Sequence, residues 1–412
     1  MVVGCGSWVV GRTAAFIATR PQGDVLTQDT ELRTQNPVRG RLGPVLFHCM
    51  DVELRRIRLP FAAPFRTALG IQQDRDVLLV GVRTDGGKGW GECVAMNQPI
   101  YTAEYVSGAH SVIRDVLLPL LSGSGVTAIT LGPILTSIQG HRMAKAALEM
   151  ALLDAELRSS DTSLATYLGA AARRVEVGVA LGIDRDVARL LDTVRRYIDR
   201  GYRRVKLKIM PGWDIEPVAA VRETFGSDLT LQVDGNRAYG PAEMARLSAL
   251  DQFDLAMIEQ PFGDLVTHAT FARTVRTPIC LDESITSTEA TRLALSLGAC
   301  SIVNIKPGRV GGYLEARRIH DLCVARGVPV WCGGMFETGL GRAANLALAA
   351  LPGFTLPSDI SESSRYFEQD ITDPFLLEPD GTIVVPDGPG IGVMPDPERL
   401  AEITTSVEHF SI

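Results

Sequence analysis

The sequence predicts an α/β protein in which a modified (β/α)8-type barrel follows a separate α+β domain. Between about residues 171 and 355, short apolar runs alternate with segments of helical periodicity, and charged residues close successive runs at steps of 26, 25, 23 and 24 residues. A repeat of that length accommodates one strand, one helix and two short loops, and such units build a parallel sheet. From about residue 50 to 170 strands precede helices, which is typical of an independent α+β domain.

Composition places the chain among globular proteins and excludes two classes of partner. Hydrophobic residues make up 46% of its 412 residues and charged residues 22%, which allows a sizeable buried core. Lysine and arginine number 41, aspartate and glutamate 48, and no block of basic residues occurs in this chain of net charge −7. We therefore expect neither nucleic acid nor a membrane as a partner.

The cysteines indicate a reducing compartment. They are seven, an odd number, and they are scattered without C-x-x-C spacing, so we expect free thiols and a cytoplasmic protein. The six histidines are isolated from one another along the chain, and we expect ordinary surface or core roles for them.

Residues 1–49 differ from the rest of the chain in composition and in residue pattern. They contain no lysine, and an apolar opening is followed by a polar run without periodicity. Arg12 comes after the apolar stretch, whereas a secretory signal peptide carries its basic residues before it. We expect residues 1–49 to be a disordered extension without function, and translation could itself begin at Met50.

The α+β domain begins with two predicted strands. The alternating Val-Glu-Leu at 52–54 and the apolar run at 77–82 predict them, and the prolines and glycine between residues 60 and 70 predict loops that separate them. Apolar residues at helical spacing then predict helices over 105–121 and 142–158.

The barrel, expected over residues 171–355, opens with the stretch at 175–182, where the alternation of strands and helices begins. Beyond it the chain becomes irregular and rich in proline, with one short strand predicted at 382–385. We expect residues 356–412 to return to the first domain, because an isolated short strand needs a partner.

Two lysines lie on one face of the second predicted barrel strand. Lys206 and Lys208 are two residues apart in an apolar context, and strand alternation points both side chains the same way. Neighbouring like charges lower each other's pKa, so we expect a lysine able to act as a base. The structural alternative is an edge strand whose lysines lie in solvent.

Three carboxylates follow at strand ends. Asp234, Glu259 and Asp282 each close an apolar run, and Lys306 closes the next one. The carboxyl ends of parallel strands converge on one face of a barrel, where such folds carry their chemistry. Three carboxylates without histidine or cysteine suit a hard cation such as Mg²⁺ or Mn²⁺. Helix capping explains one such residue easily and three in register poorly.

These residues together can remove a proton from a weak carbon acid. A cation between Lys208 and Lys306 can hold a substrate carboxylate while one lysine takes the neighbouring proton. The resulting enediolate needs the cation and the second ammonium to stabilise its charge.

Six short motifs surround these charged residues. They are Lys-Leu-Lys-Ile-Met-Pro-Gly-Trp-Asp (206–214), Val-Asp-Gly-Asn (233–236), Ile-Glu-Gln-Pro (258–261), Leu-Asp-Glu-Ser (281–284), Asn-Ile-Lys-Pro-Gly-Arg-Val-Gly-Gly (304–312) and Trp-Cys-Gly-Gly-Met-Phe-Glu-Thr-Gly (331–339). Together they resemble the enolase superfamily, muconate-lactonizing subgroup, and within it the o-succinylbenzoate synthase / N-acylamino acid racemase family. The similarity runs from about residue 50 to 397.

The resemblance implies a capping domain over a modified barrel. It implies Mg²⁺, with Mn²⁺ as a substitute, on Asp234, Glu259 and Asp282, and acid/base catalysis by Lys208 and Lys306. It further implies that the loops at 60–70 and 96–101 close over the substrate. The residues implied in substrate binding are Lys206, Asn236, Tyr101 and Glu337. Ala180 stands where relatives often have serine, which leaves one substrate contact open.

The same resemblance implies a small-molecule carboxylate substrate and a homo-oligomer. The main reaction expected is dehydration of 2-succinyl-6-hydroxy-2,4-cyclohexadiene-1-carboxylate by an o-succinylbenzoate synthase of menaquinone biosynthesis. Racemisation of N-acylamino acids is the alternative, alone or as a second activity, and dipeptide epimerisation is less favoured. A metal-dependent ligand-binding barrel without activity is the non-enzyme alternative, but such a protein would be expected to lose one of the five charged residues, and all are present.

A dinucleotide site is the competing motif-based interpretation. Residues 339–344 match G-x-G-x-x-A after a predicted strand. The first strand–helix unit lacks the motif, and close packing between strand and helix explains these glycines better.

Overall fold

The computed structural model describes residues 50–68, 70–85, 87–122 and 125–412. The expected disordered extension, residues 1–49, lies outside the described residues.

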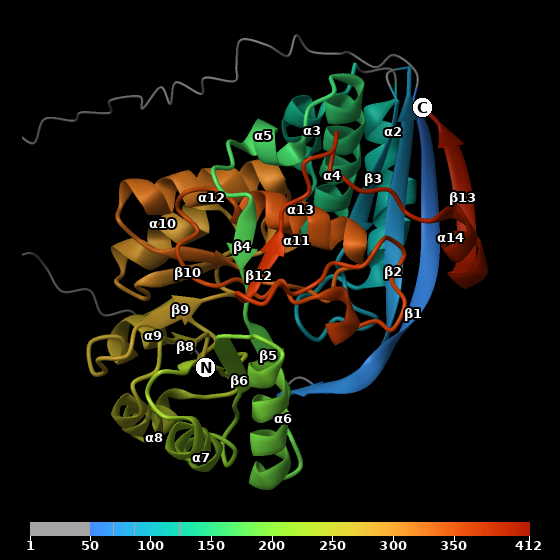
Figure 1. The fold of residues 1–412 in the computed structure, drawn as a ribbon. Coiled ribbons are helices and arrows are strands. Elements are labelled where there is room, and N and C mark those ends of the chain that lie inside the picture. The colour runs from blue at the N-terminus through green and yellow to red at the C-terminus, as the bar shows by residue number, and fades with distance from the viewer. Residues whose placement is uncertain (1–49, 69, 86, 123–124) are drawn as a thin grey trace, which may run out of the picture. The chain divides into compact units, whose positions relative to one another are not determined.

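A four-stranded antiparallel sheet contains both ends of the described chain. Its order is β13-β1-β2-β3, so the C-terminal strand pairs with the N-terminal one (Figure 1). The bounds are Asp51–Thr67 for β1, Gly70–Thr84 for β2, Gly87–Cys93 for β3 and Thr404–Ser411 for β13. The sequence did not predict β13, whose half-exposed residues lack clear alternation.

The expectation of loops between residues 60 and 70 is wrong. Strand β1 runs through Pro60 and Pro64 and forms a long hairpin with β2. The pairing shifts between Pro60 and Phe65, so the residues between them have no partner in register. Proline lacks an amide hydrogen and is tolerated in strands at such irregularities. The hairpin can therefore continue past both prolines.

Helices cover one side of this sheet, and the longest lies directly on β3. Helix α4 (Arg142–Ser159) packs there because Gly89 and Gly91 leave room for its backbone. A Cβ atom at either glycine would overlap the backbone of α4 at Ala151 or Ala147. The other helices here are α1 (Val106–Val112), a π-helical turn (Ile113–Leu117), α2 (Leu118–Leu121), α3 (Ala128–Ile134), a 3-10 turn (Leu135–Ser137) and α5 (Leu164–Leu168).

A curled parallel sheet of seven strands forms the barrel, with its strands side by side in chain order. They are β5 (Val179–Leu181), β6 (Arg204–Lys208), β7 (Thr230–Asp234), β8 (Ile258–Glu259), β9 (Ile279–Leu281), β10 (Ile302–Ile305) and β11 (Val330–Cys332). The strands are buried, as a parallel sheet covered by helices requires. The modified barrel and the separate α+β domain with its antiparallel sheet confirm the predicted fold class.

The connecting helices and 3-10 turns follow the strands. They are α6 (Val187–Asp199), α7 (Ile215–Phe225), α8 (Met244–Ser248) with turns at Pro241–Glu243 and Ala249–Phe253, α9 (Leu265–Phe271), α10 (Thr288–Ser296), α11 (Pro307–Val310), α12 (Tyr313–Ala325) and α13 (Gly339–Ala349).

An irregular segment, residues 354–361, bridges the two edges of the parallel sheet. The amide of Asp359 donates to the carbonyl of Cys332 on β11 over 2.9 Å. At the other edge, the Gly178 amide donates to the Ser358 carbonyl over 2.8 Å. The segment thus takes the place of an eighth strand and closes the barrel.

The last part of the chain adds a third sheet, which has two strands. Strand β12 (Thr382–Val384) pairs with β4 (Arg174–Glu176), which directly precedes the barrel. A 3-10 turn (Ser363–Arg365) and α14 (Pro397–Ile403) complete the elements before β13.

Packing accounts for the glycine motif at 339–344. It forms the first turns of α13, a helix buried along its whole length. A Cβ atom at Gly339 would overlap the Thr372 side chain, and one at Gly341 would come within 2.7 Å of the Glu337 side chain. These glycines let neighbouring groups approach the helix backbone.

The cysteines and the helices that the structure describes bear on two expectations, free thiols and the lack of a membrane partner. All five cysteines within the described ranges are buried free thiols, Cys93, Cys280, Cys300, Cys323 and Cys332. Among the helices that the structure describes, none combines the length and the apolar character needed to cross a bilayer.

Candidate active site

Five charged residues lie at the same edge of the parallel sheet. Lys208, Asp234 and Glu259 are the last residues of β6, β7 and β8, and they are in register with one another. Asp282 and Lys306 directly follow β9 and β10. Because all five strands are parallel and adjacent, the side chains converge on the carboxyl-terminal face of the barrel.

The three carboxylates form a compact buried cluster. Asp234, Glu259 and Asp282 each contribute one oxygen, and these oxygens lie within 4.8 Å of one another. All three residues are 0% exposed. Their donor atoms are carboxylate oxygens alone, which are the ligands that hard divalent cations prefer. The cluster therefore fits a metal site of the kind the sequence predicts.

Two carboxylates of the cluster have pKa values that are shifted in opposite directions. Burial raises the pKa of Asp234, but the nearby ammonium groups of Lys208 and Lys206 outweigh that effect and lower it. Burial and the negative charge of Asp234 raise the pKa of Glu259. The carboxylates thus repel one another at close range, and a bound divalent cation would relieve that repulsion.

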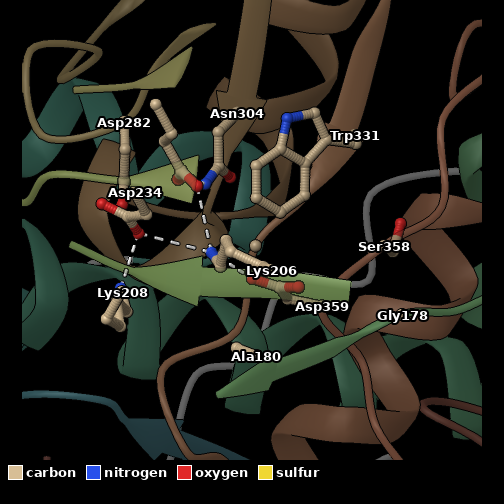
Figure 2. A network of polar contacts seen from close by, with 12 residues as sticks. Gly178, Ala180, Lys206, Lys208, Asp234, Asp282, Asn304, Trp331, Ser358 and Asp359 are labelled. Atoms are coloured by element: carbon tan, nitrogen blue, oxygen red, sulfur yellow. Dashed lines mark hydrogen bonds and ion pairs between the residues drawn. The ribbon is translucent and has the colours of Figure 1, made fainter. Parts of the chain in front are cut away.

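The two predicted catalytic lysines flank the carboxylates from opposite sides. Lys208 lies on β6 and donates to Asp234 Oδ2 over 2.5 Å (Figure 2). Lys306 follows β10 and donates to Asp282 Oδ2 over 2.8 Å. The sheet order β6-β7-β8-β9-β10 places all three acidic strands between the two lysines.

Lys206 lies deeper in the barrel than Lys208. Its ammonium donates to Glu259 Oε2 over 3.0 Å and forms an ion pair with Asp359 on the barrel-closing segment. It is 2% exposed, so the structure excludes the alternative of an edge strand with solvated lysines. Both lysines face the barrel interior, as strand alternation predicts (Figure 2).

The expectation that neighbouring lysines lower each other's pKa is wrong for Lys206. Burial lowers the pKa of Lys206, but the carboxylates of Asp359 and Glu259 outweigh burial and raise it above the ordinary lysine value. Lys306 behaves in the same way, since Tyr101 and surrounding carboxylates outweigh burial and raise its pKa. Lysine–carboxylate pairing thus dominates lysine–lysine repulsion.

A cavity opens above these groups, and the N-terminal domain supplies part of its wall. The residues that line it are Phe65, Thr67, Gln72, Met96, Ile100, Tyr101, Ala180, Lys206, Lys208, Asn236, Lys306, Gly334, Met335, Phe336, Asp359 and Tyr366. The first six belong to the β1–β2 hairpin and to the segment after β3. These are the two segments expected to close over a substrate.

The predicted substrate-binding residues divide into two groups. Lys206, Asn236 and Tyr101 line the cavity. The described residues of the lining do not include Glu337, whose carboxylate accepts the Met335 amide over 2.7 Å and the Asn345 side-chain amide over 3.0 Å. Its oxygens hold the loop after β11, and substrate binding by Glu337 stays a prediction.

Arg309 and Asn304 are polar groups of the site that the sequence did not single out. The Arg309 guanidinium forms an ion pair with Asp282 at one end of the cluster. The Asn304 side-chain amide donates to Glu259 Oε1 over 2.7 Å. Both lie in the motif at 304–312, so their nearness to Lys306 was the available signal. The motif alone does not reveal which neighbours face the barrel interior.

Backbone strain accumulates around the site. Asn236, Gln260 and Phe336 follow β7, β8 and β11 with φ values of 41°, 37° and 61°, in the left-handed region that non-glycine residues rarely adopt. Such conformations cost free energy and persist where the surrounding structure imposes them, often at functional sites. Asn236 uses its position to accept a hydrogen bond from Lys208 over 2.8 Å.

Two family models match the chain. The model described as "Mandelate racemase / muconate lactonizing enzyme, N-terminal domain" matches residues 50–169, and "Enolase C-terminal domain-like" matches residues 189–399. The chain belongs to the enolase superfamily. The residues that converge at the barrel mouth lie within the second match.

Individual enolase-superfamily relatives cover most of the chain. An N-succinylamino acid racemase of Amycolatopsis sp is 56% identical over 358 residues, which are 86% of this chain and 97% of the relative. An o-succinylbenzoate synthase of Geobacillus stearothermophilus is 46% identical over 87% of this chain and 96% of the relative. The crystal structure of an enolase-superfamily member from Listeria innocua superposes with a TM-score of 0.85 at 41% identity, covering 88% and 99% of the two chains.

Proposed function

We propose that this enolase-superfamily protein is an o-succinylbenzoate synthase, which dehydrates 2-succinyl-6-hydroxy-2,4-cyclohexadiene-1-carboxylate. One observation carries the proposal: Lys208 and Lys306 flank a buried carboxylate cluster from opposite sides, and both lysines line the same cavity. That geometry suits removal of a proton next to a substrate carboxylate. The synthase from Geobacillus supports the choice of reaction by its identity and coverage.

Asp234, Glu259 and Asp282 would hold the metal, which we propose to be Mg²⁺. When bound, it supplies a positive charge that stabilises the enediolate developing on the substrate. Their complete burial keeps water from weakening that interaction.

Lys208 takes the proton next to the substrate carboxylate in this proposal. Asn236 orients the amine, since its side-chain oxygen accepts a hydrogen bond from Lys208 Nζ over 2.8 Å. The bond between the substrate and its hydroxyl oxygen then breaks, and Lys208 returns the proton that it took to the departing oxygen, which leaves as water. Lys306 stays protonated and faces the negative charge, a role that its raised pKa favours.

Racemisation of N-succinylamino acids is the second candidate. It needs a proton donor and acceptor on each face of the substrate, and lysines on both sides of the cluster meet that need. The racemase from Amycolatopsis, at 56% identity, favours this activity in the same site. Both reactions share the first proton transfer, so one protein can carry both.

The domain boundaries and the cover over the site belong to the same proposal. Residues 50–170 form the capping domain, 171–355 supply the strands of the barrel, and 356–412 first complete the closure of the barrel and then return to the cap. The pairing of β13 with β1 supports the last assignment. The cap contributes Phe65 and Tyr101 to the cavity wall.

The test is to assay the purified protein with Mg²⁺ on both substrates. Formation of o-succinylbenzoate is followed by absorbance, and racemisation of N-succinyl-L- and D-amino acids by polarimetry. We expect the protein to catalyse the dehydration, to lose this activity when the metal is chelated and to regain it when Mg²⁺ is added. Racemisation without dehydration would favour the second candidate, and turnover of neither substrate would reject both.

A further inference from the structure

Asp359 joins two buried cations at the closure of the barrel. One of its oxygens, Oδ1, pairs with Arg204 at the start of β6, and the other, Oδ2, pairs with the Lys206 ammonium. The three residues are 7%, 1% and 2% exposed. Burying charged groups to this degree costs free energy unless they are closely paired. We therefore ask what the buried charges do in addition to closing the barrel.

Closure by itself accounts for only half of this network. Arg204 also donates to the Pro357 carbonyl over 2.8 Å, which ties the segment at 354–361 to β6. That function needs Arg204 and one oxygen of Asp359. It does not explain why the second oxygen turns to Lys206 and why Asp359 lines the cavity.

The Lys206 ammonium is held from several sides. It has three N–H groups, of which one donates to Glu259 over 3.0 Å and one faces Asp359. The ring of Trp331 lies 4.9 Å from the nitrogen, and the Trp331 indole N–H is itself fixed by a hydrogen bond to Cys280 Sγ over 3.3 Å. Asp234 Oδ2 lies 3.5 Å from the same nitrogen, and Lys206 also lines the cavity, so its ammonium faces both the cluster and the space for a ligand.

Without Asp359, the nearest anions to Lys206 would be carboxylates of the cluster. Glu259 lies at 3.0 Å and Asp234 at 3.5 Å from the ammonium. An ammonium drawn toward these oxygens would compete with a divalent cation for them. Asp359 lies on the barrel-closing segment and offers the ammonium an anion outside the cluster, so that Glu259 and Asp234 do not hold the ammonium alone.

We propose that Asp359 is a positioning residue that shares the Lys206 ammonium with Glu259 and Asp234, so that the ammonium competes less with a metal for these carboxylates, and that holds the ammonium at the cavity wall, where it faces the substrate carboxylate. The second half of this inference rests on the proposed function, whereas the first half concerns metal binding alone. Asp359 acts through Lys206 and does not touch the reacting atoms.

A double-mutant cycle tests the coupling. Asp359→Asn and Lys206→Met are made singly and together, and Mg²⁺ affinity is measured by calorimetry without substrate, alongside kcat and KM for dehydration and racemisation. We expect Asp359→Asn to weaken Mg²⁺ binding about tenfold and kcat/KM about 100-fold in the natural background. In the Lys206→Met background each effect should shrink to about twofold or less, because the residue through which Asp359 acts is gone.

Two further variants separate positioning from folding. Asp359→Glu keeps the charge and shifts it by one methylene, so Mg²⁺ affinity should stay near that of the natural protein while kcat falls by about tenfold. Asp154→Asn is the matched control, a buried aspartate that pairs with Arg158 over 3.0 Å in the other domain. It should lower thermal stability and leave metal affinity and kcat unchanged.

Equal losses from Asp359→Asn in both backgrounds would overturn the proposal, as would unchanged Mg²⁺ affinity in a folded Asp359→Asn protein. If Asp359→Asn does not fold, the same cycle is run with Asp359→Glu, and equal kcat losses in both backgrounds would overturn it. The Mg²⁺ measurements need no substrate, so they decide on the metal half even if both assigned reactions fail.

Discussion

The hydroxyl of Tyr101 donates a hydrogen bond to Asp282 Oδ1 over 2.8 Å, and so joins the N-terminal domain to the carboxylate cluster of the barrel. The same hydroxyl accepts a hydrogen bond from Lys306 over 3.2 Å, and the tyrosine ring lies 4.8 Å from the Lys306 nitrogen. Tyr101 is 4% exposed, so solvent cannot replace these contacts. A change in the position of the cap would therefore reach both a candidate metal ligand and a candidate catalytic lysine.

Removing this hydroxyl tests the link. Tyr101→Phe keeps the ring beside Lys306 and deletes the hydrogen bond to Asp282. We expect kcat/KM to fall about tenfold, since hydrogen bonds to charged groups contribute about 1.5–3 kcal/mol and Lys306 and Arg309 still hold Asp282. Tyr105→Phe, at a 40% exposed residue, is the control and should change nothing. Steady-state kinetics that do not distinguish the two variants would contradict this role.

Metal binding should depend on all three carboxylates. Glu259→Gln removes one charged ligand from the cluster, and we expect Mg²⁺ binding, measured by calorimetry, to weaken at least about 100-fold. Turnover should disappear with it and should also disappear in EDTA. Asp264→Asn changes an exposed carboxylate that caps α9 and should leave Mg²⁺ binding intact. Full activity in EDTA would show that the cluster serves only as counter-ions for the lysines.

The two lysines should act on opposite faces of a racemisable substrate. In D₂O, Lys306→Arg keeps the positive charge but loses the basic amine, so exchange of the α-proton should persist for only the enantiomer that faces Lys208. Proton NMR of N-succinyl-L- and D-amino acids measures this exchange. Lys88→Arg, on the antiparallel sheet, is the control for the lysine-to-arginine change. Racemisation of both enantiomers at the natural rate by Lys306→Arg would leave a one-base dehydratase as the better description.

The stability of the folded protein should fall as the pH rises through the raised pKa of a buried glutamate. Burial raises the pKa of Glu149 to about 7, and its carboxylate accepts the Leu314 amide over 3.0 Å. The folded state therefore holds this proton more tightly than the unfolded chain, whose ordinary value is 4.5. The stability that this proton gives the folded protein is fully present below about pH 4.5 and is lost as the pH rises through 7. The free energy of unfolding falls by about 3 kcal/mol at most over this range.

Urea unfolding at pH 5 and pH 8 measures this contribution. Glu149→Gln should flatten the decrease between the two pH values, because an amide does not titrate. Other buried carboxyls with a raised pKa, Glu92 and Glu156, will keep part of the slope. Glu398→Gln, an exposed change on α14, should keep the whole slope. An unchanged slope in Glu149→Gln would show that Glu149 is not the group responsible.

The reactive face was predictable because its pattern is local. Asp234, Glu259 and Asp282 each end an apolar run, and the length of one strand–helix unit sets the spacing between them. Parallel strands then bring the ends together whatever the details of packing. The lysines at 206 and 208 follow the same rule, because strand alternation alone places them on one face.

Other features depend on contacts between distant parts of the chain. Asp359 lies in an irregular, proline-rich stretch, and it pairs with Arg204, which is 155 residues earlier. The pairing of β13 with β1 joins the two ends of the described chain. Neither has a local periodicity that could reveal it. The long β1–β2 hairpin was missed for a related reason, since prolines argue for a loop until the partner strand shows where the register shifts.

The sequence by itself determined the α/β class, the barrel, the carboxylate cluster and the two flanking lysines, because these follow from periodicity and from the polarity of parallel strands. Only the tertiary structure decided the raised pKa of Lys206, the hydrogen bonds that the Glu337 carboxylate accepts and the position of Asp359. The physical reason is that a pKa or a hydrogen bond depends on every charge and donor within a few ångströms. Those neighbours are assembled from strands and loops far apart in the chain.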